Sequence, residues 1–406
     1  MNTGRRRMRS AGRWRRRTWV AGGTALAALL AFALLGVGCS SLPPLPESEP
    51  WSCEGGAEPA DLWHCIDAAG PIPPKTEGAF RSTSRVVRGD LDRKRADQRA
   101  ATACESDPPN GFEDLRGVSV EGAPPLHGYR FAGSPDKPLV VVVHGLFDSR
   151  NSAYVRRTAE ALAARDFGVL VPDMRWHGCL LKPAWLPTLG LAEGGDLVRW
   201  GRWAAQDGAG ETNRPVGLLG FSLGALDVLH ALGRPDPPRA GAVAVSPPAA
   251  LEQVFDSFSG PIYWQDRGLL GLIDRSFRKL LTRRLEDQDI PVTEAGPFAS
   301  MLAHLERRTG VPGPLALALS DPVPPIERAS RPLLILAAED DPLFGRLVVE
   351  ELRRAAAENP AAYLLATPGG GHIGFPGSDP QWFIDVVERF FTESAEVRVA
   401  SDSPAP

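Results

Sequence analysis

The sequence predicts an α/β fold with a mostly parallel central sheet and helices on both faces. Short apolar runs alternate with segments of helical periodicity over most of residues 111–391. The clearest run, residues 139–143, is Leu-Val-Val-Val-Val, which is typical of a strand buried on both faces of its sheet. In such folds ligands bind beyond the carboxyl ends of the strands. Functional side chains are therefore expected directly after the apolar runs.

The apolar runs and periodic segments give the order of the elements. The expected strands are 116–120, 127–131, 139–143, 169–171, 216–219, 242–245, 333–337 and 361–366. The expected helices are 153–165, 196–205, 225–232 and 381–391. The core is thus expected in two parts, residues 111–246 and 332–393, followed by a disordered tail, 394–406.

The alternation stops between residues 247 and 331, which we interpret as a lid inserted after the sixth strand. It contains an amphipathic stretch, 269–285, and a Pro-rich return to the core. Basic residues in such a stretch are typical of a solvated helix face, with contact to lipid headgroups as the alternative. The basic residues concerned are Arg275, Arg278, Lys279, Arg283 and Arg284.

Residues 1–38 are typical of a targeting segment. They contain eight arginines, followed by an uncharged apolar stretch at 19–37. The run Arg16-Arg17-Thr18-Trp19-Val20 resembles a twin-arginine export signal, although arginine pairs also arise by chance in such a segment. The positive-inside rule places the rest of the chain outside the cytoplasm, which predicts an exported protein of the bacterial cell envelope.

Cys39 ends the apolar stretch, as the lipid-modified cysteine does in bacterial lipoproteins. We expect lipidation there, so that a linker, 39–50, tethers the protein to the membrane. The alternatives are an uncleaved signal anchor, since a 19-residue apolar stretch nearly spans a bilayer, or secretion. Residues 51–110 form an N-terminal extension to which the sequence assigns no function.

The charge of the chain excludes one class of partner. The whole chain has a formal charge of −4, and without residues 1–38, which hold eight arginines and no acidic residue, the charge is −12. Nucleic acids and anionic lipids are bound through basic patches. The exported part is therefore not expected to bind nucleic acid.

Four cysteines follow Cys39, and an even number favours two disulfides in an oxidising compartment. The short spacing favours a Cys53–Cys65 pair, with unpaired buried thiols as the alternative. No Cys or His spacing is typical of a metal site.

The strongest functional motif is Gly220-Phe221-Ser222-Leu223-Gly224, which lies between an expected strand and an expected helix. A serine hydroxyl needs an adjacent base to become a nucleophile, and flanking glycines permit the sharp turn that presents it. Ser222 is the candidate nucleophile.

Two later strands end at the matching acid and base. His372 follows 361–366 in a glycine-rich loop and is the candidate general base, and Asp341 follows 333–337 and would orient the imidazole. Asp340 is the alternative acid, although Leu343 two positions on favours Asp341.

The turn His144-Gly145-Leu146-Phe147 follows the most apolar strand. We expect the backbone N–H groups of Leu146 and Leu223 to bind the developing oxyanion. His144 is expected to order its loop and not to carry protons. His177 is expected as a structural turn residue, with a pocket-lining role as the alternative.

Together, His144-Gly145-Leu146, the Ser222 motif, Asp340-Asp341-Pro342 and the run from Gly370 to Phe375 resemble the YheT-like branch of the α/β-hydrolase superfamily. The resemblance covers about residues 112–391. It implies an α/β-hydrolase fold and a serine hydrolase that acts on carboxylic esters, short-chain or lipid-derived, without a cofactor. The alternatives are a thioesterase, amidase or peptidase on the same fold, or a non-catalytic envelope lipoprotein.

Overall fold

The computed structural model describes residue 104 and residues 106–182, 185–206, 214–249, 251, 278–341 and 343–395. The predicted targeting segment, Cys39, the linker, almost all of the extension, Cys53, Cys65 and the tail beyond 395 lie outside the described residues. No helix among the described residues is long and apolar enough to cross a membrane.

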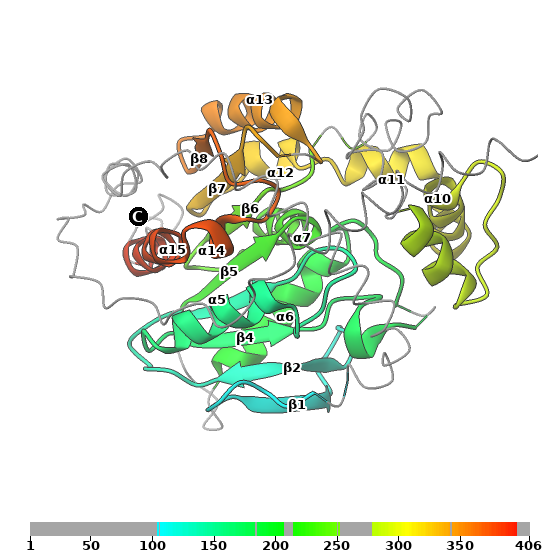
Figure 1. Cartoon of the computed structure of the whole chain (residues 1–406). Coiled ribbons are helices and arrows are strands. Elements are labelled where there is room, and N and C mark those ends of the chain that lie inside the picture. The colour runs from blue at the N-terminus through cyan, green and yellow to red at the C-terminus, as the bar shows by residue number, and fades with distance from the viewer. Residues whose placement is uncertain are drawn as a thin grey trace, which may run out of the picture. The chain divides into compact units, whose positions relative to one another are not determined.

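One eight-stranded sheet organises the described chain (Figure 1). Its spatial order is β1-β2-β4-β3-β5-β6-β7-β8, and all neighbours from β4 to β8 are parallel. Only β1 and β2 pair in the antiparallel sense, with each other and, for β2, with β4. The predicted mostly parallel sheet is confirmed. The strands are β1 Glu113–Val118, β2 Leu126–Phe131, β3 Leu139–Val143, β4 Gly168–Pro172, β5 Val216–Phe221, β6 Ala242–Val245, β7 Leu333–Ala338 and β8 Ala362–Thr367.

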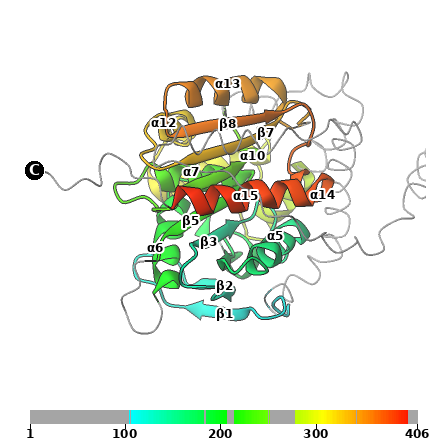
Figure 2. The same ribbon diagram turned by 90° about the vertical axis from the view of Figure 1, so that its left-hand side faces the viewer.

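Helices cover both faces of the sheet, as predicted. On one face lie α5 (Ala153–Ala163), α14 (Phe375–Ser378) and α15 (Pro380–Ser394), seen across the sheet in Figure 2. On the other lie α6 (Glu193–Ala205), α7 (Leu223–Leu232), α12 (Val323–Glu327) and α13 (Gly345–Ala357).

The core follows from the alternation of side chains along each buried strand. In β3, Leu139, Val141 and Val143 pack against the face with α6 and α7, while Val140 and Val142 pack against the face with α5 and α15. All five are fully buried. Each face therefore has its own apolar cluster, and the sheet is held rigidly between them.

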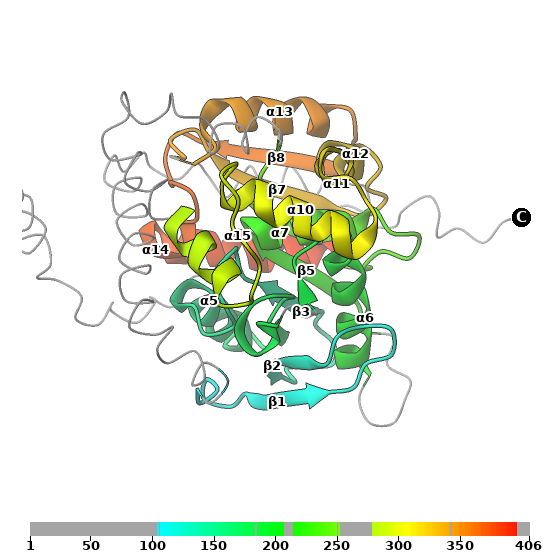
Figure 3. The same ribbon diagram turned by 90° about the vertical axis from the view of Figure 1, so that its right-hand side faces the viewer.

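The described part of the segment inserted between β6 and β7 consists of helices joined by short turns and coil. A helical stretch at 278–286 precedes α10 (Pro297–Thr309) and α11 (Gly313–Leu319). Figure 1 shows α10 and α11 beside the sheet, and Figure 3 shows them from that side. The expected break in the strand-helix alternation lies here, although α10, α11 and α12 were not expected as separate helices.

A disulfide joins Cys104 to Cys179, with 5.3 Å between their Cα atoms. This pair is one of those that the cysteine count allows, and it leaves Cys53 and Cys65 to pair with each other. The Cys53–Cys65 bond stays a prediction.

Candidate active site

Ser222 lies between β5 and α7 in a strained backbone conformation. Its φ and ψ are 54° and −116°, so a residue with a Cβ occupies the left-handed side of φ space. Such strain costs on the order of 1–3 kcal/mol and persists where the surrounding structure enforces it. The strained turn exposes part of the Ser222 side chain at the carboxyl end of the sheet.

The flanking glycines are required by close contacts of the backbone. A Cβ on Gly220 would lie 2.1 Å from the Gly224 oxygen, and a Cβ on Gly224 would lie 2.5 Å from the His144 oxygen. Gly145 faces Ser222, since a Cβ there would lie 3.3 Å from the Ser222 Cβ. The glycines thus let the elbow and the turn after β3 approach each other.

The structure brings Ser222, His372 and Asp341 into one hydrogen-bonded chain. The His372 Nε2 is 2.8 Å from the Ser222 Oγ, and the His372 Nδ1 is 2.8 Å from the Asp341 Oδ2. Because an ionised carboxylate only accepts hydrogen bonds, the proton sits on Nδ1, and Nε2 is left to accept from the serine hydroxyl. The Phe344 ring and the imidazole pack edge to face, and both His372 and Asp341 are buried.

Of the two candidate acids, only Asp341 contacts the imidazole. Its other oxygen accepts the N–H groups of Leu343 and Phe344, at 2.8 and 3.2 Å. Asp340 instead accepts the N–H of Gly371 at 2.8 Å and so shapes the loop that carries His372. Partial burial, reinforced by Asp341, raises the pKa of Asp340, although the Gly371 N–H opposes that shift.

The predicted oxyanion donors lie on the two turns that meet at Ser222. Leu223 is the first residue of α7, so its N–H has no partner within the helix. Leu146 follows Gly145, whose oxygen accepts from the His144 Nδ1 at 2.9 Å and from the Asp148 N–H at 3.2 Å. In a planar trans peptide the N–H points away from the carbonyl, so these two bonds fix the direction of the Leu146 N–H.

Two histidines hold the turns after β3 and β4 together. The His144 Nε2 accepts the N–H of Met174, and the His177 Nε2 accepts the N–H of Phe147, both at 3.1 Å. Burial lowers the pKa of His144, which keeps its ring neutral and able to accept. His144 orders its loop as expected. His177 has the expected structural role, because its bond to the Phe147 N–H holds the predicted oxyanion turn.

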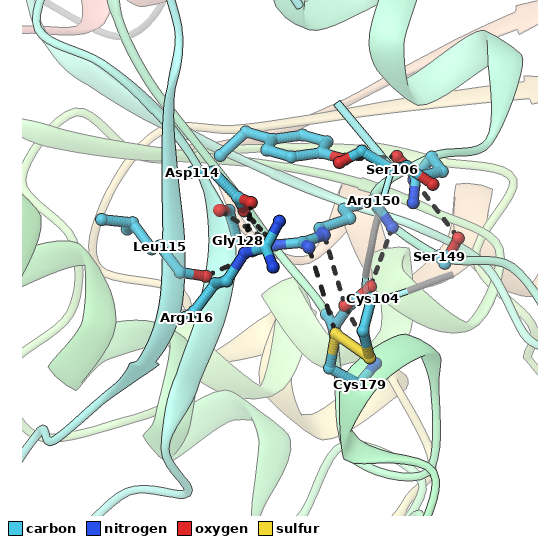
Figure 4. A network of polar contacts seen from close by, with 12 residues as sticks. Cys104, Ser106, Asp114, Leu115, Arg116, Gly128, Ser149, Arg150 and Cys179 are labelled. Carbon is cyan, nitrogen blue, oxygen red and sulfur yellow. Dashed lines mark hydrogen bonds and ion pairs between the residues drawn. A yellow bond between two sulfur atoms is a disulfide. The ribbon is translucent and has the colours of Figure 1, made fainter. Parts of the chain in front are cut away.

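A fully buried arginine, Arg150, connects the loop after β3 to β1 and β2 (Figure 4). The Arg150 Nη1 donates to the Gly128 oxygen at 3.0 Å and pairs with Asp114 at 3.1 Å. Asp173 accepts the N–H groups of Arg150 and Cys179, each at 3.1 Å. The disulfide therefore anchors the end of the extension to the loop that holds the oxyanion turn.

One prediction about the inserted segment is wrong. Arg284 does not lie on a solvated helix face: its side chain is buried against Phe147 and Trp176, whereas its neighbour Arg283 is exposed. In the sequence both residues belong to one charged run, and only their tertiary contacts distinguish the buried Arg284 from the exposed Arg283.

An apolar cluster connects the inserted segment to the predicted oxyanion residues. Leu223 belongs to it, and the partly buried Leu146 packs against it. Its members from the inserted segment include Leu281, Leu285 and Phe298. The surroundings of the Ser222 elbow on this side are therefore hydrocarbon. Among the described residues, no group of three His, Cys, Asp or Glu side chains is placed to hold a metal ion.

Comparison with known proteins agrees with this architecture. The chain is 27% identical over 278 residues to the protein named "Putative esterase YheT" of Escherichia coli (strain K12), covering 63% of this chain and 76% of that protein. It is 26% identical over 244 residues to "Putative esterase slr0264" of Synechocystis sp. (strain ATCC 27184 / PCC 6803 / Kazusa), covering 58% and 57%. The resemblance to the YheT-like branch is confirmed.

A solved structure shares the fold. The esterase Pf2001 of Pyrococcus furiosus superposes with a TM-score of 0.50 and 20% identity, over 70% of this chain and 93% of that one. Residues 140–386 match the alpha/beta hydrolase family, which is more than half of the chain. The chain therefore belongs to the alpha/beta hydrolase family.

Proposed function

We propose that this protein is a carboxylic ester hydrolase that works through an acyl-enzyme on Ser222. The observation that carries the proposal is the hydrogen-bonded chain from the Ser222 Oγ through His372 to Asp341, with 2.8 Å at each link. The esterase names of the two relatives support ester bonds as the target.

The positions of these atoms support the following reaction. The His372 Nε2 removes the proton of Ser222 while the Oγ attacks the ester carbonyl, and the N–H groups of Leu146 and Leu223 bind the oxygen that becomes negative. His372 then protonates the departing alcohol. Water, activated by the same nitrogen, releases the acid and frees Ser222. Asp341 keeps the proton on Nδ1 and stabilises the imidazolium.

The apolar cluster around Leu146 and Leu223 favours substrates with an apolar acyl or alcohol group. Hydrocarbon surroundings bind a hydrocarbon chain through burial, at about 0.8 kcal/mol per CH₂ group. Chain length should therefore affect kcat/KM strongly.

The test is hydrolysis of p-nitrophenyl esters from acetate to palmitate by the full chain in detergent. Ser222→Ala and His372→Ala should each lose at least about 10³-fold in kcat, because the members of such a triad act as a unit. Equal rates for the wild type and both variants would overturn the proposal.

The proposal includes a place of action, the bacterial cell envelope, with a lipid on Cys39 as the membrane anchor. The Cys104–Cys179 disulfide supports it, since such bonds persist in oxidising compartments. Mass spectrometry of the protein extracted from the membrane should show a lipid on Cys39 and loss of residues 1–38. An unmodified Cys39 in a chain that keeps residues 1–38 would mean that an uncleaved signal anchor holds the protein.

A further inference from the structure

Arg284 is a buried cation that no step of the proposed reaction uses. Its Nη1 donates to the Trp176 carbonyl oxygen at 3.1 Å, and its Nη2 donates to the Phe147 carbonyl oxygen at 3.3 Å. These acceptors lie 108 and 137 residues earlier in the chain. A single guanidinium of the inserted segment therefore binds the turns after both β3 and β4.

Both acceptor residues have strained backbones. Phe147 has a φ of 65° and Trp176 a φ of 63°, in the left-handed region that aromatic residues rarely occupy. Such conformations persist where neighbouring groups fix them from several sides. The planar fork of Arg284 is suited to bind two carbonyls at once, and its carbon Cζ lies 5.1 and 5.7 Å from the centres of the two rings.

The contact between Arg284 and Phe147 lies in the turn that carries the Leu146 N–H. The next residue, Phe147, is held on both sides: its N–H donates to His177 at 3.1 Å, and its carbonyl accepts from Arg284. The peptide before Leu146 is thus fixed through the Gly145 oxygen, and the residue after Leu146, which is Phe147, is fixed by Arg284. Without Arg284, the Phe147 carbonyl loses its donor, and the turn is held only through the Gly145 oxygen and the Phe147 N–H.

We infer that Arg284 is a positioning residue, through which the inserted segment holds the Leu146 N–H in place for the oxyanion. The inference rests on the proposed function. A displaced N–H weakens binding of the transition state more than binding of the ester, because the charge on the oxygen is largest in the transition state. Loss of Arg284 should therefore lower kcat with little change in KM.

The experiment compares Arg284→Gln and Arg284→Lys with Arg283→Gln, in the full chain with p-nitrophenyl esters. Complete loss of one oxyanion donor costs roughly 10²- to 10³-fold, so a displaced donor should lower kcat of Arg284→Gln by about 10- to 100-fold. Arg284→Lys should also be impaired, because an ammonium lacks the planar fork. Arg283→Gln removes an exposed charge from the same helical segment and should match the wild type.

A second measurement separates positioning from a general effect on folding. A trifluoromethyl ketone forms a hemiketal with Ser222 whose negative oxygen occupies the oxyanion site, so its inhibition constant should weaken in parallel with kcat/KM. Millimolar guanidinium should restore part of the activity of a further variant, Arg284→Ala, and should leave the activity of Arg283→Gln unchanged. Near-UV circular dichroism normalises every rate to the folded fraction.

Wild-type kcat and wild-type inhibitor affinity in folded Arg284→Gln would overturn the inference. So would equal losses in Arg284→Gln and Arg283→Gln. Ser222→Ala, assayed in parallel, separates the two proposals. If that variant stays active, the proposed function fails, whereas an inactive Ser222→Ala with an unimpaired Arg284→Gln rejects the part played by Arg284 alone.

Discussion

Asp340 and Asp341 share one turn but have different partners. Asp341 holds the imidazole, and Asp340 holds the backbone of the loop that carries it. Asp341→Asn should therefore lower kcat by about 10³- to 10⁴-fold, because an amide no longer stabilises the imidazolium or fixes its tautomer. Asp340→Asn retains an oxygen that accepts the Gly371 N–H and should lose less than about fivefold. Steady-state kinetics of the two variants measures this difference in kcat. Equal losses of kcat would contradict the assignment of Asp341 as the residue that orients His372.

Asp227 in α7 is a buried carboxyl whose Oδ1 has no hydrogen-bond partner among the described residues. Burial, with repulsion from Glu193 and Asp196, raises its pKa well above the ordinary value of 3.8. In the pH range between the ordinary and the raised pKa, the folded state keeps a proton that the unfolded state has lost. The stability contributed by this proton is present at low pH and declines, by up to about 1.4 kcal/mol per pH unit, as pH rises through that range.

Asp227→Asn should remove this part of the pH dependence, so the variant should gain stability over the wild type as pH rises from 5 to 8. Urea denaturation at both pH values measures the difference. Asp287→Asn, at an exposed position, is the matched control. A constant difference between Asp227→Asn and the wild type at both pH values would show that Asp227 ionises as readily in the folded as in the unfolded protein.

At the scale of elements, the sequence predicts the strands better than the helices of the inserted segment. The apolar runs end where β3 and β6 end, because strands buried on both faces leave no polar position to blur the boundary. α11 and α12 were missed because each has proline in its first turn, and proline is typical of turns as well as of helix starts. α13 could have been predicted, since its buried Val348, Val349 and Leu352 are spaced three and four apart.

The same distinction holds for the site. Ser222, Asp341 and His372 follow strands of one sheet, so their order and positions in the chain are sufficient to expect them together. The burial of Arg284 depends on carbonyls more than 100 residues away, on turns whose strain is not encoded in any local pattern. Hydrophobic periodicity along the chain therefore could not predict the contact of Arg284 with these carbonyls.

The packing of the elbow against β3 leaves no room for a side chain at Gly224 in α7. Alanine normally favours a helix over glycine by about 1 kcal/mol. At Gly224 the added Cβ would lie 2.5 Å from the His144 oxygen and 2.8 Å from the Val143 oxygen, so α7 and the oxyanion turn must move apart. Gly224→Ala should therefore lower both the melting temperature and kcat.

Gly233→Ala, at the other end of the same helix, is its control. A Cβ there would be 3.6 Å or more from its neighbours, which is ordinary contact, so stability should change by less than about 0.5 kcal/mol. If Gly224→Ala behaved like Gly233→Ala, the close approach of α7 to β3 would not limit the site.

At the scale of the whole molecule, the turns after β3 and β4 join three distant parts of the described chain. Arg284 reaches them from the inserted segment, Arg150 ties them to β1 and β2, and Cys179 ties them to Cys104. Changes far from Ser222 in sequence can therefore alter the oxyanion turn. The disulfide is the covalent member of this set, and it spans 75 residues.

Opening this disulfide should cost stability first and activity second. A cross-link over a loop of this length restricts the unfolded chain and typically contributes about 2–4 kcal/mol. The free energy of unfolding of the double variant Cys104→Ser/Cys179→Ser should be lower by that amount, so it should unfold at a lower urea concentration. Reduction should destabilise the wild type but not the variant. Its kcat should fall less than that of Arg284→Gln, because the bonds of Asp173 to the Arg150 and Cys179 N–H groups remain. Urea unfolding with and without reductant tests this. Equal urea midpoints for the oxidised wild type and the variant would mean that the disulfide contributes nothing to stability and that non-covalent contacts alone hold the residues around Cys104. The disulfide would then no longer support the proposal that the protein acts in an oxidising compartment.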